Sequence, residues 1–521
     1  MVDPPKISRT RQAENLLEVL RHSGVLNVER PRQVYCNRDI NLGDIGLIGF
    51  DMDYTLALYD QDAIEKLSVE KTLERLVDER GYPPAILDIE IPTDFAIRGL
   101  VIDTHRGNIF KLDSHRHVGK VYHGFREVTG DDLYEYRVNS MRMTTSRYAL
   151  VDTLFALPDA ALYAALVDYF ETAEPEKTHD WQRLYRDIRY CIDLAHRDDS
   201  IKNEIIAHTD RYLERTVDLA LTLHKFRSAG KRLFVLTNSY APFTDHILSF
   251  LLDDLLPEYP RWQNYFDIVV TGAQKPDFFT ERNPFLRVDP DGTVLGKEFS
   301  QFDSSAIYQG GNLVDFERIS GFRGNRVLFV GDHIYGDIVR SKKSSAWRTV
   351  MIVQEMEREL SQTAALREEN SRLESLELEI QRVNEEIAFD QGLTYKVDAL
   401  LNGQGDEALD DENGGKGETE LPDFDPEQLR RARKEIKKNH DHLRRRRRDL
   451  LDEILRLEKK FESQFNRYWG LLFKQGNKNS IFGEQVEVYA CLYTSRVENF
   501  AHYSPLHYFR APRQPMPHER Y

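Results

Sequence analysis

Three short apolar segments in the chain each end in a cluster of polar residues. The segment LIGF precedes DMDYT, KRLFVLT precedes NSY, and RVLFVG precedes DHIYGD. Short continuous apolar runs bounded by polar residues are typical of buried parallel strands. Because ligands of open α/β sheets bind at the carboxyl ends of the strands, this pattern predicts a functional site where the polar clusters meet.

A long insertion, roughly residues 61–205, separates the first of these segments from the second. It begins with a helical pattern and contains RGLVIDTHRGNIFKLDSHRHVGKVYHG, whose alternation and turn residues predict β-hairpins. An insertion at this point would form a cap over the expected site. We therefore predict a catalytic core formed by residues 1–60 and 206–354, with 61–205 as an α+β cap that determines specificity.

The pattern changes near residue 354, after which charged segments carry apolar residues at heptad spacing. Two such runs occur, comprising Leu366, Leu373, Leu376, Ile380, Val383 and Ile387, then Ile436, Leu443, Leu450, Ile454, Leu457 and Phe461. The intervening residues 402–428 are rich in glycine and acidic residues and predict a flexible tip. We expect an antiparallel, coiled-coil-like helical hairpin over 355–475, followed by a segment, 476–521, that packs back on the core.

Composition limits the cellular location and the partners. The chain has 521 residues, 40% of them hydrophobic, and a net charge of −16, which works against coating nucleic acid. Cys36, Cys191 and Cys491 are far apart, so we expect neither a disulfide framework nor a CxxC metal site. The run Arg444 to Arg448 is more typical of a solvated helix face than of a nucleic-acid patch. Since no segment approaches the ~18 apolar residues of a membrane span, we expect a soluble cytoplasmic protein without nucleic-acid or membrane partners.

Asp51 and Asp53 follow the first apolar segment with one residue between them. In extended backbone both side chains share a face, and two neighbouring carboxylates need a cation or a proton. A magnesium ion bound by Asp51 and a second acid would hold a phosphate against Asp51, allowing attack on phosphorus and a phospho-aspartate intermediate. Asp53 would then protonate the departing alcohol and later activate water. An isolated DxD, however, is more typical of a surface turn or a helix cap.

The second apolar segment and a later one add groups that suit a phosphate. Thr237, Asn238 and Ser239 can bind phosphate oxygens through hydroxyl and main-chain N–H groups. Lys275 follows the run FDIVV, and Pro276 would stiffen its loop so that the ammonium stays near the developing phosphoryl charge. Separately, TNS is typical of a helix N-cap and Lys275 of an ordinary exposed lysine.

The third apolar segment ends in Asp332 and Asp337. Asp332 can complete the magnesium shell, and Asp337 can orient Lys275 through an ion pair. As an isolated pair, these acids are equally typical of the start of a helix. The ordered set DxDxT, TNS, KP and GDxxxxD, each after an apolar strand, is far more specific than any of its parts.

This ordered set resembles the haloacid dehalogenase superfamily of phosphotransferases, which implies a Rossmannoid parallel sheet with an inserted cap. The resemblance implies a nucleophile, an acid/base residue, a phosphate-binding hydroxyl, a lysine and magnesium-binding acids at the matching positions, which are Asp51, Asp53, Thr237, Lys275, Asp332 and Asp337. It also implies that the main-chain carbonyl of Asp53 binds magnesium. An aspartate at position 53 is similar to the phosphatase branch rather than the dehalogenase branch.

A closer resemblance is to the cytosolic purine 5'-nucleotidases that prefer IMP and GMP. It rests on FDMDYTLA, RGLVIDT, DTLFALP, LTNSY, KPDFF, GDHIYGDIVRSKK and WRT, and covers most of residues 30–355, with a weaker match at 508–519. It implies a magnesium-dependent enzyme that hydrolyses IMP or GMP to nucleoside and phosphate, or transfers the phosphate to a nucleoside. It also implies a homo-oligomer, either a dimer or a tetramer.

Residues of the expected cap can recognise the base. Arg189, Asp193 and His196 stand at i, i+4 and i+7, on one helical face, where Arg189 can donate to a purine carbonyl and Asp193 can accept from a ring N–H. Hypoxanthine and guanine offer this pairing, whereas adenine does not. Phe155 and His196 can sandwich the base, because aromatic faces stack on nucleobases. The resemblance likewise places these two positions against the base and Lys202 near the phosphate end. The residues alone equally predict an i,i+4 salt bridge, a core Phe155 and a structural His196.

Two other functions remain compatible with the sequence. An enzyme with the same chemistry on another phosphate ester would need Asp51 but neither Arg189 nor Asp193. An interaction protein would use the helical hairpin and carry a vestigial catalytic body, although none of the expected catalytic residues is missing.

Overall fold

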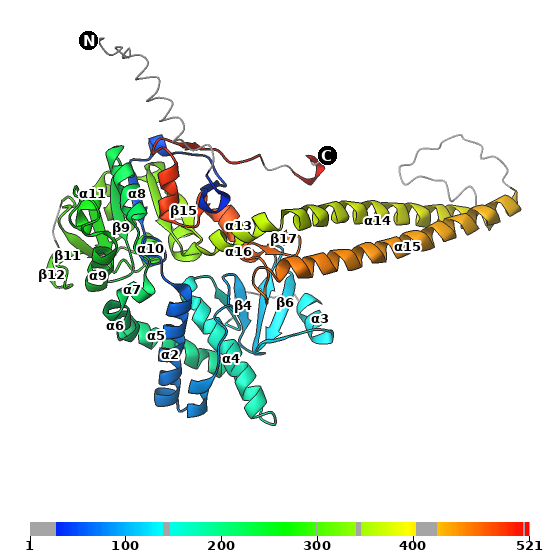
Figure 1. The fold of residues 1–521 in the computed structure, drawn as a ribbon, viewed down its shortest axis with the longest axis horizontal. Coiled ribbons are helices and arrows are strands. Elements are labelled where there is room, and N and C mark those ends of the chain that lie inside the picture. The colour runs from blue at the N-terminus through cyan, green and yellow to red at the C-terminus, as the bar shows by residue number, and fades with distance from the viewer. Residues whose placement is uncertain are drawn as a thin grey trace, which may run out of the picture. The chain divides into compact units, whose positions relative to one another are not determined.

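The computed structural model describes residues 28–138, 146–297, 300–339, 345–402, 425–513 and 516–519. The chain divides into two compact units, one formed by the residues up to 361 and from 471 onward, the other by residues 362–470 (Figure 1). Within the described ranges, no helix is both long and apolar enough to cross a membrane. Most of the expected flexible tip, residues 403–424, lies outside the described residues.

A ten-stranded sheet forms the centre of the first unit in the part of the chain that the structure describes. All neighbours from β18 to β13 are parallel, whereas β1, β11 and β12 are antiparallel additions at the edges. In spatial order the strands are β1 (Tyr35–Cys36), β18 (Leu492–Thr494), β15 (Arg348–Ile352), β14 (Val327–Gly331), β3 (Leu47–Phe50), β9 (Arg232–Leu236), β10 (Ile268–Thr271), β13 (Ile307–Gly310), β11 (Phe285–Val288) and β12 (Val294–Gly296). This parallel-rich α/β sheet confirms the predicted fold class.

Strands β14, β3 and β9 coincide with the three apolar segments and lie side by side at the centre of the sheet. Every residue of β3 and β14 is buried, as expected for central parallel strands. Gly49 is required in β3, because a Cβ atom there would lie 2.0 Å from the Phe234 ring. Since β10 follows β9 in the sheet, four polar segments meet at one edge.

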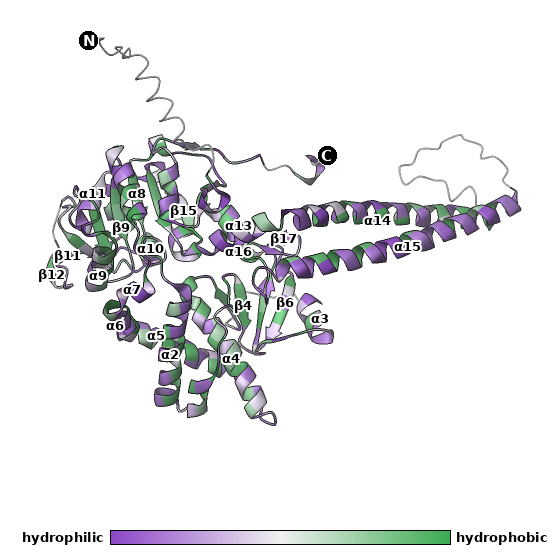
Figure 2. Cartoon of the chain, in the orientation of Figure 1, coloured by the Kyte–Doolittle hydropathy of each residue, from purple (hydrophilic) through white to green (hydrophobic). Residues whose placement is uncertain are grey.

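Helices connect the parallel strands and bury their apolar faces against the sheet. They are α8 (Val217–Ser228), α9 (Ala241–Leu252), α10 (Asp277–Thr280) and α11 (Leu313–Ser320). One core cluster contains Phe234, Phe316, Phe329 and Trp347, all less than 3% exposed. Figure 2 shows the hydrophobic character of the strands in this part of the molecule.

The C-terminal segment returns to the first unit, which accounts for its apolar and aromatic residues. Helix α16 (Ile481–Tyr489) packs into a cluster with Met351 and Val353 beside β15, and β18 extends the main sheet. Strand β19 (Tyr508–Phe509), close to the C-terminus, pairs with β2 (Ile40–Asn41), which lies in the N-terminal part of the sequence.

The insertion after β3 forms a second, antiparallel sheet with its own helices. In spatial order its strands are β7 (Arg126–Glu127), β6 (Val118–His123), β5 (Asn108–Leu112), β4 (Leu100–Asp103) and β8 (Tyr148–Val151). The helices are α2 (Gln61–Arg80), α3 (Asp131–Val138), α4 (Leu157–Ala173), α5 (Trp181–Arg197), α6 (Ser200–Ala207) and α7 (Thr209–Tyr212). Asp60 caps α2 by accepting a hydrogen bond from the main-chain N–H of Ala63 at 2.9 Å.

The second unit contains two long helices, α14 (Arg367–Leu401) and α15 (Pro426–Glu462), that run side by side (Figure 1). Ion pairs between the two helices show that they are antiparallel, because the residue number of the partner in α15 falls as that in α14 rises. The pairs are Arg372–Glu453, Glu379–Arg446 and Asp398–Arg433. The buried seam contains heptad residues named above, among them Leu376, Val383, Ile387, Leu443, Leu450 and Ile454. Residues 444–448 are exposed, as expected for a solvated face. Figure 2 shows the largely hydrophilic character of α15.

The second unit is shorter than the 355–475 segment predicted for the hairpin. Helix α13 (Glu355–Ala365) begins in the first unit, where Glu355 pairs with Arg98 and Glu359 accepts a hydrogen bond from the Leu472 N–H. Heptad spacing indicates which residues form the seam of a hairpin. It does not indicate polar contacts such as these, which place the start of α13 in the first unit.

Candidate active site

Three buried carboxylates lie together beyond the carboxyl ends of β3 and β14. One oxygen each from Asp51, Asp332 and Asp337 lies within 4.8 Å of the others. The Lys275 ammonium lies 2.9 Å from Asp51 Oδ1 and 2.6 Å from Asp337 Oδ1. Gly331 makes the cluster possible, because a Cβ atom there would lie 2.5 Å from Asp337 Oδ2.

Burial and mutual repulsion perturb the pKa values of these groups. Burial raises the pKa of Asp51 to about 6, although the Lys275 charge opposes the shift. Burial, followed by repulsion from Asp337 and Asp51, raises the pKa of Asp332 well above its usual range. Burial alone would lower the pKa of Lys275, but the two carboxylates outweigh it and raise that pKa.

The cluster has the chemistry of a site for a hard divalent cation. The Asp332 carboxylate makes no hydrogen bond or ion pair with any described residue, although the side chain is buried. Lys275 pairs with Asp51 and Asp337, whereas Asp332 has no ion pair with any described residue, and carboxylate oxygens are the ligands that Mg²⁺ prefers. The residues therefore fit the predicted magnesium ion, and Asp337 joins the cluster directly.

Asp53 has different partners from Asp51. Its Oδ1 accepts a hydrogen bond from the Tyr59 hydroxyl at 2.6 Å, and its Oδ2 accepts one from the Ser239 hydroxyl at 2.7 Å. Burial and then repulsion from Asp51 raise its pKa to about 6. A carboxyl group with this pKa can both donate and accept a proton near neutral pH.

The segment after β9 organises the lysine loop. Asn238 binds the Lys275 main chain twice, accepting from its N–H at 2.6 Å and donating to its carbonyl at 3.0 Å. Thr237 is fully buried, and its hydroxyl accepts a hydrogen bond from the Ser239 N–H at 3.1 Å. The three residues thus connect the aspartate pair to the lysine.

A cavity of about 880 Å³ opens beside this cluster. Its lining combines Asp53, Asn238 and Ser239 from the first polar segments with the five cap residues predicted to bind substrate, which are Phe155, Arg189, Asp193, His196 and Lys202. Asp51, Thr237, Lys275, Asp332 and Asp337 are not among its lining residues. The structure therefore brings together eight of the predicted residues around one cavity, next to the carboxylate cluster.

Arg189 forms the predicted salt bridge with Asp193 at 2.8 Å, and its other terminal nitrogen pairs with Asp159 of α4. Asp159 is almost completely buried, whereas Asp193 is half-exposed in the cavity lining. Burial raises the pKa of Asp159 to about 6, and the Arg189 charge opposes the shift. Asp159 therefore anchors Arg189 from behind and leaves Asp193 facing the cavity.

The rings of Phe155 and His196 do not form two parallel walls. Their centroids lie 5.9 Å apart and their planes are at 89°, so a base can stack on only one of them. Burial and then the Lys202 charge lower the pKa of His196, which favours a neutral ring. The Lys202 ammonium forms an ion pair with Asp199, with Nζ lying 3.0 Å from Oδ1.

A model of the 5' nucleotidase family matches residues 34–521. The chain belongs to the 5' nucleotidase family. This confirms the predicted family and the classification as a 5'-nucleotidase hydrolase. The family match does not identify the metal ion or the preferred nucleotide.

Curated relatives carry the same family name. A 5'-nucleotidase domain-containing protein of Dictyostelium discoideum is 28% identical over 97% of this chain and 79% of its own. 5'-nucleotidase domain-containing protein 2 from rat and from human are each 31% identical, over 68% and 64% of this chain, which spans 65% of either relative. Among solved structures, a predicted phosphoglycolate phosphatase from Haemophilus somnus 129pt covers 60% of this chain and 86% of its own, with 15% identity and a TM-score of 0.26.

Motif spacing did not indicate several residues of this 5' nucleotidase family site. Tyr59 bonds Asp53 from six residues away, and Asp159 reaches Arg189 from another helix. His333 lines the cavity, and its Nδ1 accepts from the Gly336 N–H, which leaves the proton on Nε2. The sequence GDHIYGD offered a signal for His333 alone, because it stands beside a predicted metal ligand.

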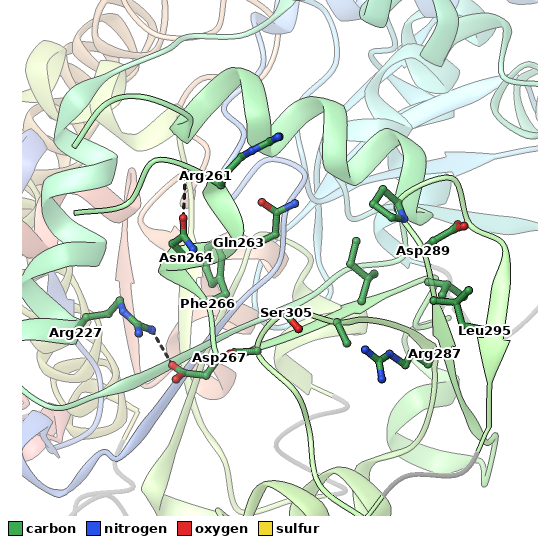
Figure 3. Close-up of a pocket in the computed structure, with 15 residues that line it drawn as sticks. Arg227, Arg261, Gln263, Asn264, Phe266, Asp267, Arg287, Asp289, Leu295 and Ser305 are labelled. Carbon is green, nitrogen blue, oxygen red and sulfur yellow. Dashed lines mark hydrogen bonds and ion pairs between the residues drawn. The ribbon is translucent and has the colours of Figure 1, made fainter. Parts of the chain in front are cut away.

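A second cavity, of about 500 Å³, lies away from these residues (Figure 3). It is lined near the starts of β10 and β13 by Asp267 and Ala306, at the opposite edge of the sheet. Arg227 there is paired with Asp267 at 2.8 Å. None of the predicted site residues contributes to its lining, so this cavity does not support the predicted chemistry.

Proposed function

We propose that this protein is a magnesium-dependent 5'-nucleotidase that hydrolyses IMP or GMP to nucleoside and phosphate through phospho-Asp51. The observation that carries the proposal is a buried cluster of Asp51, Asp332 and Asp337 beside a cavity that Arg189 and Asp193 line. Phosphotransfer to a nucleoside acceptor, a cytoplasmic location and homo-oligomeric assembly belong to the same proposal, because each is implied by the family resemblance.

The chemical steps follow from the positions of the carboxylates. An Asp51 oxygen attacks phosphorus, the bond from phosphorus to the ester oxygen breaks, and Asp53 gives its proton to the departing nucleoside. Asp53 then accepts a proton from water, which attacks phosphorus and releases phosphate from Asp51. Lys275 and the Thr237 hydroxyl balance charge on the phosphoryl oxygens. Magnesium, with Asp51, Asp332 and the Asp53 carbonyl as proposed ligands, supplies further neutralisation of that charge.

Recognition of the base belongs to the cap. Hypoxanthine and guanine present a ring N–H and an adjacent carbonyl, which match the acceptor Asp193 and the donor Arg189. Adenine lacks the N–H and would give Asp193 no hydrogen bond from the base, at a cost in binding. Phe155 or His196 offers one stacking face, and Lys202 supplies positive charge toward the phosphate end.

Two substrates separate this proposal from a phosphatase for other esters. We expect Asp193→Ala to lower kcat/KM for IMP by roughly 10- to 100-fold, while hydrolysis of a simple aryl phosphate stays near the unaltered rate. Steady-state kinetics on both substrates provide the measurement. Equal losses on the two substrates would show that Asp193 does not read the base.

A further inference from the structure

Arg98 is a buried arginine that bonds the main chain of a residue in the carboxylate cluster. It lies just before β4, and its side chain has no exposed surface. One terminal nitrogen, Nη1, donates a hydrogen bond to the Asp332 carbonyl at 2.9 Å. Arg98 thereby connects the insertion after β3 to the loop that ends β14.

The remaining donors of Arg98 are used by a single carboxylate. Nε and Nη2 bond the two oxygens of Glu355 at 2.8 Å and 2.6 Å, in the bidentate geometry that only arginine offers. The guanidinium also lies over the Phe482 ring, 4.8 Å from its centroid. Contacts with α13, α16 and the residue that follows β14 therefore fix the orientation of the guanidinium.

Asp332 depends on this contact more than its neighbours in the cluster do. Asp51 is held by Lys275 and the Met52 N–H, and Asp337 is held by Lys275 and the His333 N–H. Among the described residues, the Asp332 carboxylate has no comparable partner, so its position is set through its main chain. The Arg98 guanidinium is buried although its partner Glu355 is partly exposed, and burying a charged group in this way is seldom the most stabilising choice, which favours a role in positioning.

We propose that Arg98 is a positioning residue for the divalent cation, because it holds the Asp332 main chain so that the carboxylate faces Asp51 and Asp337. The proposal rests on the proposed function in one respect, the binding of a cation by this cluster. Groups that orient metal ligands typically change metal affinity by roughly 10- to 100-fold when they are replaced.

The test measures binding of Mn²⁺, a paramagnetic hard divalent cation, to the full-length protein without substrate. Titrations followed by electron paramagnetic resonance compare the unaltered protein with Arg98→Lys, which keeps the charge but cannot reach both Glu355 and the Asp332 carbonyl. We expect the Mn²⁺ Kd to rise about tenfold. With an aryl phosphate substrate, the Mg²⁺ concentration for half-maximal rate should rise similarly, while kcat at saturating Mg²⁺ stays close to the unaltered value.

Two further variants keep the test decisive. Arg147→Lys alters a comparable arginine–carboxylate pair, with Asp103, that touches no residue of the cluster, and should leave the Mn²⁺ Kd unchanged. Glu355→Gln removes the ion pair that orients the Arg98 guanidinium and should therefore weaken Mn²⁺ binding. This variant provides the test if Arg98→Lys fails to fold. Unchanged Mn²⁺ affinity in both Arg98→Lys and Glu355→Gln, an equal loss in Arg147→Lys, or no Mn²⁺ binding by the unaltered protein would overturn the proposal. Failure of IMP hydrolysis alone would count against the proposed function and leave this comparison intact.

Discussion

Asp51 and Asp53 differ by two positions in sequence, yet their surroundings suit two different tasks. Asp51 faces Lys275 within the carboxylate cluster, whereas Asp53 faces Tyr59 and Ser239 at the cavity. A nucleophile needs a deprotonated oxygen stabilised by positive charge, and an acid/base residue needs a pKa near the working pH. The geometry therefore suits Asp51 and Asp53 to the two proposed roles, although both residues are aspartates.

Replacement of the nucleophile gives the first prediction at this scale. We expect Asp51→Asn to lower kcat by ~10³-fold or more, because the amide cannot form the phospho-aspartate. Rapid acid quenching with phosphorus-labelled IMP should trap labelled enzyme only when Asp51 is present. Normal turnover by Asp51→Asn would contradict the covalent mechanism.

Asp51 and Asp332 of the carboxylate cluster were predictable because each stands immediately after an apolar strand, whereas Asp337 was indicated by the GDxxxxD spacing. Parallel strands place their carboxyl ends together, so the positions of Asp51, Thr237 and Asp332 follow from the strand pattern. Tyr59 and Asp159 were not predictable in this way, because their partners are set by packing between separate elements. Spacing along the chain carries no record of such contacts.

Helix α5 illustrates what a pattern leaves open at the scale of an element. Its i, i+4 spacing predicts both a base-reading face and a salt bridge, and the structure contains the Arg189–Asp193 pair while both residues line the cavity. The additional contact with Asp159 in α4 fixes which side of Arg189 is free. The predicted enclosure of a base by Phe155 and His196 required parallel rings, and the perpendicular arrangement leaves one stacking face.

The Asp159–Arg189 contact predicts a pH dependence of substrate binding. Because burial raises the pKa of Asp159 to about 6, this carboxyl takes up a proton as the pH falls from 7 to 5 and its attraction for Arg189 weakens. We therefore expect KM for IMP to rise over this range as Arg189 loses its anchor. Asp159→Asn should have a high KM at both pH values, and a persisting pH dependence in this variant would assign the effect to another group.

At the scale of the whole molecule, we predict that the first compact unit carries the active site and that the second is not needed for catalysis. All the residues that line the cavity or form the carboxylate cluster belong to the first unit. The second unit is held by its own seam, in which Leu376 and Leu450 are almost completely buried. Several heptad positions named from the sequence lie in this seam, because heptad spacing is a local property, whereas Glu359, just before the unit, contacts Leu472, which is distant in sequence.

Loss of a seam side chain should separate stability from activity. We expect Leu450→Ala to destabilise the hairpin by about 2–5 kcal/mol, through lost burial and the cavity it leaves. Hydrogen exchange should therefore accelerate in α14 and α15, while kcat/KM for IMP stays within twofold of the unaltered value. A large loss of activity with a correctly folded first unit would show that the hairpin contributes to catalysis.

The most direct test of the central claim is phosphate release from IMP, GMP, AMP, UMP and an aryl phosphate, measured with and without Mg²⁺. We predict Mg²⁺-dependent release that is fastest with IMP and GMP, because the Asp51 cluster needs the cation and the Arg189–Asp193 pair matches a 6-oxopurine. Release from the aryl phosphate alone would retain the Asp51 chemistry and contradict the purine pocket. No Mg²⁺-dependent release from any of the five would contradict the account of the active site itself.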